Sequence, residues 1–237
     1  MFATLREELR FGAVFVRGHL LRLLLLFAGL LLPLWGFAEL ADEVGERQPF
    51  LFDEPILRYA HALAGDSLDR IAVFMSAAGY QWGVVPFDVA LIAALAWRRR
   101  MREGLFAGIA IVGSALLNMT TKQFFARDRP SLWESIAPET TFSFPSGHAM
   151  GSATLAWVLV LLVWGTPWRW PVVVTVCGFV AAVAFSRVYL GVHYPSDILA
   201  GWAAASVWTV SVYLLVFRRG FRPWRASQGS DHSSATG

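Results

Sequence analysis

Apolar residues gather in long stretches of this chain, and short polar segments separate them. A helix needs roughly 20 apolar residues to cross the hydrocarbon of a bilayer, or slightly fewer when its ends lie in the interface. The pattern predicts six transmembrane helices, at residues 20–40, 81–97, 105–121, 148–164, 170–186 and 198–217. Residues 71–79 are also apolar, and either extend the second span or form a separate short helix. The predicted fold class is therefore all-α, an integral membrane bundle.

The polar segment after the first span contains a further helical pattern. Between Asp53 and Gly65, apolar side chains recur at helical spacing. Asp53 is placed as an N-cap and Gly65 as a stop signal. These features predict a short interfacial helix in the first outer loop.

Composition supports a membrane protein. The chain has 237 residues, of which 56% are hydrophobic and only 16% are charged, and a soluble surface needs more ionic cover than this. The single cysteine, Cys177, lies in an apolar stretch and is interpreted as a packing residue. Residues 1–222 are predicted to form one domain, and the polar, aperiodic residues 223–237 a disordered cytoplasmic tail.

Arginines in the short loops predict the orientation of the bundle. They cluster before the first span, between the second and third, after the fourth and after the sixth, at Arg6, Arg10, Arg17, Arg22, Arg98, Arg99, Arg100, Arg102, Arg169, Arg218, Arg219, Arg222 and Arg225. All these loops lie on one side of a six-span chain, so both termini are expected in the cytoplasm of a multi-pass inner (plasma) membrane protein. The first span is interpreted as an uncleaved anchor rather than a signal peptide. Because the formal charge of +3 comes from loop clusters, nucleic acid is not an expected partner.

The first of three polar clusters on the outer side is KQFFARDRP, residues 122–130. Lys122, Arg127 and Arg129 lie on the side that positive charges usually avoid, and Lys122 is the only lysine in the chain. Pro130 disfavours helix at Arg129, which is therefore expected on the following turn. Interfacial snorkelling is one interpretation of these cations, and binding of an anion such as phosphate is the favoured one.

The second cluster is PSGH, residues 145–148, at the start of the fourth span. The first N–H groups of a helix have no intrahelical partner and can bind an anion. Ser146 and Gly147 are expected to present such groups, and His148 to lie in the first helical turn. Taken alone, the segment is equally well explained by a serine N-cap beside an interfacial histidine.

The third cluster is SRVYLGVHYPSD, residues 186–197. Arg187 adds another outer cation. Pro195 suits the first turn of a helix, so His193 should precede the sixth span and Asp197 should lie in its opening turn. A carboxylate there can hold Nδ1–H of the imidazole and leave Nε2 as a base or nucleophile. A structural hydrogen bond is the favoured explanation of such a pair when it occurs alone, but three clusters on one side provide the groups for phosphoryl transfer without a metal.

These segments resemble the type 2 phosphatidic acid phosphatase superfamily, whose pattern is K-x6-R-P, then P-S-G-H, then S-R-x5-H-x3-D. The matching residues are Lys122, Arg129, Pro130, Pro145, Ser146, Gly147, His148, Ser186, Arg187, His193 and Asp197. The resemblance implies that Lys122, Arg129, Ser146, Gly147 and Arg187 bind phosphate. It implies that His193 forms a phosphohistidine, that Asp197 orients it, and that His148 protonates the leaving oxygen, with no metal or cofactor.

The resemblance also implies a membrane lipid phosphate or diphosphate as substrate, of the undecaprenyl diphosphate or the phosphatidylglycerophosphate and phosphatidic acid type. A transporter or flippase that binds an anionic head group without cleaving it is the alternative, and a metal hydrolase using His148, His193 and Asp197 is a third. Asp88, within the second span, is expected to face the bundle interior or a polar cavity. Glu134 and Glu139, between the first two clusters, are expected to be solvated.

Overall fold

The computed structural model describes residues 19–20, 23–218 and 223–224, and in this part of the chain all regular structure is helical. A π-helical turn, η1 (Phe27–Leu31), leads into α2 (Leu32–Gly45). The remaining helices are α3 (Asp53–Ala62), α4 (Asp66–Ala78), α5 (Val84–Trp97), α6 (Met101–Phe125), α7 (Gly147–Val163), α8 (Arg169–Tyr189) and α9 (Pro195–Val216). The expected all-α class is confirmed for the described residues.

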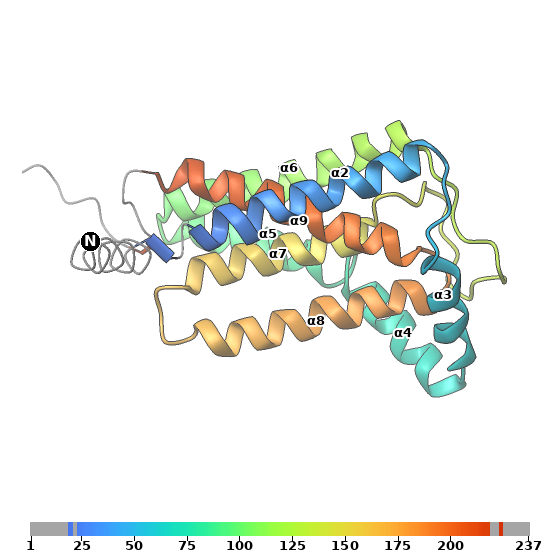
Figure 1. Ribbon diagram of the computed structural model, residues 1–237. Coiled ribbons are helices and arrows are strands. Elements are labelled where there is room, and N and C mark those ends of the chain that lie inside the picture. Colours follow the sequence, from blue (N-terminus) through green and yellow to red (C-terminus); the bar gives the residue numbers. More distant parts are fainter. Residues whose placement is uncertain (1–18, 21–22, 219–222, 225–237) are drawn as a thin grey trace, which may run out of the picture.

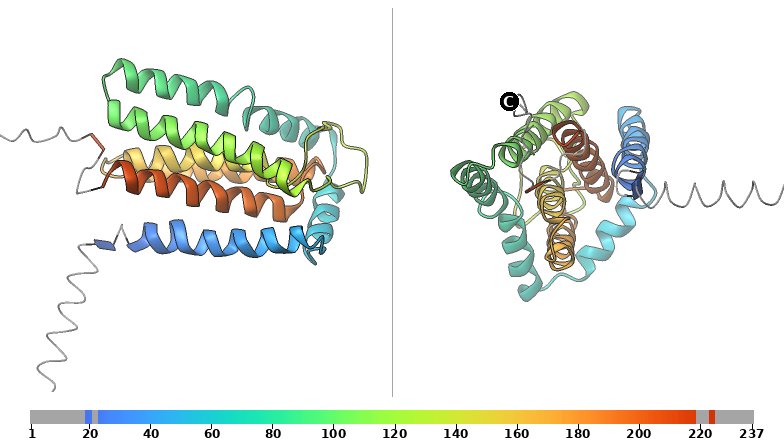
Figure 2. Two further views of the ribbon diagram at one scale, coloured as in Figure 1. Left: turned by 90° about the horizontal axis from the view of Figure 1, so that it is seen from above. Right: turned by 90° about the vertical axis from the view of Figure 1, so that its left-hand side faces the viewer.

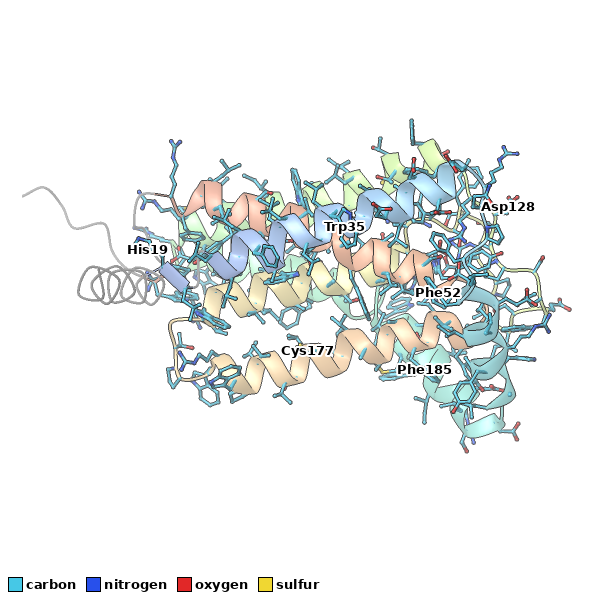
Figure 3. All side chains as sticks on the ribbon, in the orientation of Figure 1. His19, Trp35, Phe52, Asp128, Cys177 and Phe185 are labelled. Carbon is cyan, nitrogen blue, oxygen red and sulfur yellow. The ribbon has the colours of Figure 1, made fainter. Side chains whose placement is uncertain are left out.

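The long helices lie side by side along one axis (Figure 1). In the end-on view of Figure 2, α7 lies in the middle of the bundle, where it packs against α5, α6, α8 and α9. α2 packs against α9 at the edge. The described chain enters α2 and leaves α9 at the same end of the bundle, the end where His19 is labelled in Figure 3.

Four helical segments are long and apolar enough to cross a membrane, namely Leu23–Gly45, Met101–Phe125, Arg169–Tyr189 and Pro195–Val216. The other two predicted spans correspond to α5 and α7, which are apolar but only 14 and 17 residues long. At 1.5 Å per residue they extend about 21 and 26 Å, short of the roughly 30 Å of a hydrocarbon core. Large apolar side chains such as Phe27, Trp35 and Val174 are exposed on the outside of the bundle, as in an integral membrane protein.

The loop between α2 and α5 contains two helices, which lie at the far end of the bundle from His19 (Figures 1 and 3). α3 confirms the predicted short helix, although it ends at Ala62 rather than at Gly65. The expected N-cap was wrong, because Phe52 occupies that position and Asp53 is the first helical residue. Residues 71–79 belong for the most part to α4, a separate helix that packs on α8.

Tight packing holds α7 against α9 close to their first turns. A Cβ atom added to Gly201 would lie 2.9 Å from the carbonyl oxygen of Ser146, so only glycine allows this approach. Deeper in the bundle, Asp88 is buried in α5, which confirms that it faces the interior. Its Oδ1 atom has no hydrogen-bond partner in the part of the chain that the structure describes.

Several predictions about the termini fall outside the described residues. They concern the arginines at positions 6, 10, 17, 22, 219, 222 and 225 and most of the tail predicted from residue 223. Trp224, which was expected in that tail, instead packs on the bundle: its backbone N–H donates to Glu103, and its indole N–H to the carbonyl of Leu162.

Candidate active site

The three polar clusters meet at one end of the bundle. The C-terminal ends of α6 and α8 and the N-terminal ends of α7 and α9 gather there, beside α3 and α4 (Figure 1). Residues 126–146 connect α6 to α7 at this end, where Phe52 and Asp128 are labelled in Figure 3. The basic segment at residues 98–102 connects α5 to the first turn of α6 at the opposite end.

The first cluster spans the end of α6. Ala126 follows the last helical residue in a left-handed conformation, with φ of 45°, and this turns the chain out of the helix. Arg129 therefore lies in the loop, as Pro130 predicted. The ammonium group of Lys122 and the guanidinium of Arg129 both donate to the carbonyl oxygen of Phe142, so the two cations are brought together.

The second cluster begins α7 as the sequence predicted. Ser146 is the N-cap, and its Oγ accepts the N–H of Ala149 at 3.5 Å. The backbone N–H of Ser146 donates to the carbonyl oxygen of Asp197 at 3.1 Å, so it supports α9 rather than pointing at a free site. A Cβ atom on Gly147 would lie 3.0 Å from Oδ1 of Asn118, and this close approach favours glycine.

The third cluster pairs an imidazole with a carboxylate. His193 precedes α9 and Asp197 lies in its first turn, with 3.4 Å between Nδ1 and Oδ2. On the other side of the ring, Nη1 of Arg129 lies 3.2 Å from Nε2. Because a guanidinium can only donate, Nε2 accepts and the proton of the neutral ring belongs on Nδ1. This tautomer directs the Nε2 lone pair toward the cations.

A carboxylate occupies the point where these cations converge. Oε2 of Glu139 accepts from Nη2 of Arg129 at 2.7 Å, and Oε1 accepts from the buried guanidinium of Arg187. Nδ1 of His148 lies 3.8 Å from the same Oε1. The expectation that Glu139 is solvated was wrong, because its loop folds over the helix ends. Glu134, in the same loop, is exposed as expected.

The local charges fix the protonation of two residues at this site. Burial alone would raise the pKa of Glu139, but the surrounding basic groups, with Arg187 the largest contributor, outweigh burial and lower the pKa to about 2. Burial, Arg129 and Arg187 hold the pKa of His193 well below its ordinary value. At neutral pH, Glu139 is therefore charged and His193 is neutral. Positive charge and an uncharged imidazole nitrogen therefore lie side by side at this end of the bundle.

Sequence reasoning missed two acidic residues at this end and grouped Arg127 with the anion-binding cations, whereas its guanidinium pairs with two carboxylates of the protein itself. Glu139 gave no signal apart from its position between the first two clusters. Asp53 was interpreted as a helix cap, but its buried carboxylate pairs with Arg127 at 3.0 Å. The guanidinium of Arg127 also pairs with Asp197, at 2.6 Å. The position of Asp53 at the start of a predicted helix, beside the acidic Glu54, fitted a helix cap and gave no sign of a partner 74 residues away.

The acidic groups at this end are paired with arginines rather than arranged around a metal position. Glu139 and Asp197 each have an oxygen within 2.7 Å of a guanidinium nitrogen. Across residues 19–20, 23–218 and 223–224, no three His, Cys, Asp or Glu side chains converge as ligands for a metal ion. The guanidinium groups at this end therefore bind carboxylates and present positive charge that an anion can use.

Comparison with known proteins identifies relatives of this arrangement. The family model of the PAP2 superfamily matches residues 103–221, which contain all three clusters. The chain is similar to an undecaprenyl-diphosphatase of Sulfolobus acidocaldarius, with 29% identity over 69% of this chain and 78% of the relative. It is 31% identical to phosphatidylglycerophosphatase B of Bacillus subtilis, over 64% of this chain and 76% of the relative.

The fold is similar to that of a solved structure. The crystal structure of a transmembrane PAP2-type phosphatidylglycerolphosphate phosphatase from Bacillus subtilis superposes with a TM-score of 0.67 and 25% identity. The superposition covers 79% of this chain and 98% of the other. The likeness therefore includes most of the bundle.

Proposed function

The chain belongs to the PAP2 superfamily of membrane phosphatases, and we propose that it hydrolyses phosphate monoester or diphosphate head groups of membrane lipids through a phosphohistidine, without a metal. One observation carries this proposal. The carboxylate of Glu139 lies on Arg129 and Arg187, while Arg129 also contacts Nε2 of His193 at 3.2 Å. An anion held at this position lies next to a neutral nucleophile.

In the proposed reaction, a substrate phosphate replaces the Glu139 carboxylate on Arg129 and Arg187. A phosphate dianion has more charge and more acceptor oxygens than a carboxylate, and arginine forks suit it well. Lys122, which reaches the same loop carbonyl as Arg129, adds a further positive charge. These cations stabilise the charge that spreads over the phosphoryl oxygens in the transition state.

His193 is the proposed nucleophile. Its Nε2 lone pair forms a bond to phosphorus while the bond to the leaving oxygen breaks, and that oxygen takes a proton from His148. Asp197 holds Nδ1–H and stabilises the positive imidazole that forms. Nδ1 of His193 lies 3.4 Å from Oδ2 of Asp197, and such catalytic hydrogen bonds often shorten when substrate binds.

Water completes the proposed cycle. It attacks the phosphohistidine and gives its proton to His148, and the electrons of the N–P bond return to Nε2 of His193. His148 is suited to both proton transfers, because its imidazole lies beside the same anion position as Arg187. Binding of the anionic substrate there favours the protonated imidazole that the first step needs.

The membrane arrangement supports a lipid substrate. The anion site lies at one end of a bundle with a largely apolar exterior, so a head group can reach it while its tails stay in hydrocarbon. Arg98, Arg99, Arg100 and Arg169 lie at the opposite end. The positive-inside rule then supports six spans in the inner membrane, cytoplasmic termini and an active site on the outer face.

Undecaprenyl diphosphate and phosphatidylglycerophosphate or phosphatidic acid are the proposed substrate types. A transporter or flippase that binds the same head groups without cleavage remains the alternative. The His193–Asp197 pair favours the enzyme, since a binding protein needs no oriented nucleophile behind its cations.

The deciding experiment is release of inorganic phosphate from a panel of lipid monophosphates and diphosphates in detergent. Wild type should release phosphate from at least one, and His193→Ala protein with unchanged helix content by circular dichroism should release none. Equal rates from the two proteins would contradict the proposal. Head-group binding by the wild type without any phosphate release would favour the transporter.

A further inference from the structure

A second buried carboxylate lies behind the candidate catalytic pair. Asp53, at the start of α3, is 3% exposed. Its Oδ1 accepts the backbone N–H of Ser196 at 2.9 Å, and its Oδ2 accepts the Ser196 hydroxyl at 2.5 Å. Ser196 is the residue before Asp197 in the first turn of α9. Asp53 therefore fixes this turn from a helix outside the residues that the family model matches.

Arg127 lies between this carboxylate and that of Asp197. Its Nη2 is 3.0 Å from Oδ2 of Asp53, and its Nη1 is 2.6 Å from Oδ1 of Asp197. The guanidinium also stacks over the ring of Tyr194, with 4.1 Å between Cζ and the ring centroid. The planar fork of arginine suits such a bridge, because two nitrogen atoms can donate to two acceptors at once.

The two carboxylate oxygens of Asp197 bind different partners. Oδ1 is bound by Arg127, whereas Oδ2 accepts from the Ser143 hydroxyl and from the backbone N–H of Tyr194, and faces Nδ1 of His193. A guanidinium bound to Asp197 alone would draw negative charge away from the imidazole. Asp53 offsets this effect, because Arg127 then pairs with two carboxylates and neutralises less of the charge on Asp197.

We propose that Asp53 and Arg127 are positioning residues, and that the Asp53–Arg127–Asp197 array sets the orientation and charge of Asp197 for its action on His193. The proposal rests on the proposed phosphatase function. It means that α3, through Asp53, helps to position the active site and is not only an interfacial helix. The side-chain hydrogen bonds of Asp53 and Arg127 among the described residues are to Ser196, to Asp197 and to each other, so both residues would act through Asp197 and not on the substrate phosphate.

The test compares Asp53→Asn, Arg127→Gln, the double variant and Glu54→Gln. Asn keeps the shape of Asp53 but removes its charge. Glu54 is the adjacent acid, exposed and paired only with Arg58 among the described residues, so it controls for loss of a nearby carboxylate. Phosphate release gives kcat and KM, and inhibition by inorganic phosphate reports the anion site.

Each single change in the array should lower kcat about 10- to 100-fold, as expected for residues that orient a catalytic group. KM and the phosphate inhibition constant should stay within about threefold of wild type, because Lys122, Arg129 and Arg187 are unchanged. Arg127→Gln leaves two buried carboxylates without their counter-charge. Adding Asp53→Asn removes one of these carboxylates. The fold-decrease in kcat of the double variant should therefore be much smaller than the product of the two single fold-decreases.

Three results would overturn the inference. The first is a kcat for Asp53→Asn equal to that of Glu54→Gln. The second is a weakening of phosphate inhibition by the same factor as the loss of kcat, which would indicate that the substitution disturbs the whole site. The third is independent, multiplicative losses in the double variant. Absence of phosphate release from wild type is a different result, since it removes the proposed function itself and this inference with it.

Discussion

Glu139 and Arg187 form an ion pair across 48 residues of chain, and this pair closes the anion site. The guanidinium is 1% exposed, so a loop carboxylate reaches a cation that is otherwise enclosed by the bundle. In the proposed reaction, the substrate phosphate needs the arginine nitrogens that bind Glu139. Glu139 would then have to leave these nitrogens before phosphate binds.

Glu139→Gln should tighten inhibition by inorganic phosphate about fivefold, because a neutral amide competes less well for Arg129 and Arg187 than a carboxylate. The unliganded variant should melt at a lower temperature, since two cations lose a counter-charge, and phosphate should restore the difference. The pKa of about 2 keeps Glu139 charged at every working pH, so the effect should be constant between about pH 5 and 8.

Glu134→Gln is the matched control in the same loop, because this residue is exposed. It should leave phosphate inhibition unchanged. Weaker inhibition in Glu139→Gln would mean that the carboxylate assists binding instead of competing with it.

The acid limb of the pH profile of kcat/KM should lie below pH 6.5. Burial, Arg129 and Arg187 hold the pKa of His193 below its ordinary value, and the nearby charges also include Lys122 and Glu139. A lowered pKa means that the imidazole remains neutral and nucleophilic until the pH falls beneath that pKa. If His148 is the proton donor, activity should fall again at high pH as His148 loses its proton, and the pH profile should be bell-shaped.

Arg129→Gln removes the cation 3.2 Å from Nε2 and should move the acid limb to higher pH, in addition to weakening substrate binding. The measurement is kcat/KM against pH, with product release shown not to limit the rate. A monotonic profile, or an acid limb unmoved by this substitution, would count against His193 as the titrating nucleophile.

His148→Ala should lose less activity on a lipid diphosphate than on a monophosphate. A phosphate departs as a stable anion, whereas an alkoxide needs the proton that His148 is proposed to supply. The second step still needs a base, so the variant should release one equivalent of lipid product from a diphosphate quickly and then turn over slowly. Rapid-quench assays would detect this burst, and equal losses on both substrates would argue against His148 as the acid.

Activity should persist in excess chelator. Oxygens of Asp197 and Glu139 accept from arginines at 2.6 and 2.7 Å, which leaves the candidate site without a set of free ligands for a cation among the described residues. The measurement is phosphate release after prolonged dialysis against EDTA. If activity is lost and added divalent metal restores it, the protein is instead a metal hydrolase that uses His148, His193 and Asp197.

The sequence predicted the parts of this site that depend on helix ends. The order of the apolar spans along the chain places Lys122, His148 and Asp197 at the same end of the bundle. Pro130 and Pro195 locate the turns beside them. The roles of Glu139 and Asp53 could not be predicted, because they depend on how two loops fold over that end. An aspartate before an apolar helical pattern is typical of a cap, and only the tertiary structure reveals its contact with Arg127, 74 residues away.

Gly191 offers a test of how the third cluster positions its histidine. It has φ of 68°, and an added Cβ atom would lie 2.6 Å from the indole of Trp133. Its turn presents the carbonyl of Val192 to Arg129 at 2.7 Å, immediately before His193. Alanine at this position would be strained by both its backbone and the indole.

Gly191→Ala should therefore lower the free energy of unfolding by about 1–3 kcal/mol and reduce kcat, because the strain is relieved by displacing His193 or Trp133. Gly178→Ala is the control, since Gly178 lies within α8 and a Cβ atom added there would meet no neighbouring side chain within 4 Å among the described residues. That change should be neutral or slightly stabilising, because alanine favours helix. Thermal unfolding and phosphate release measured on both variants check the prediction, and equal behaviour of the two would show that the turn does not position His193.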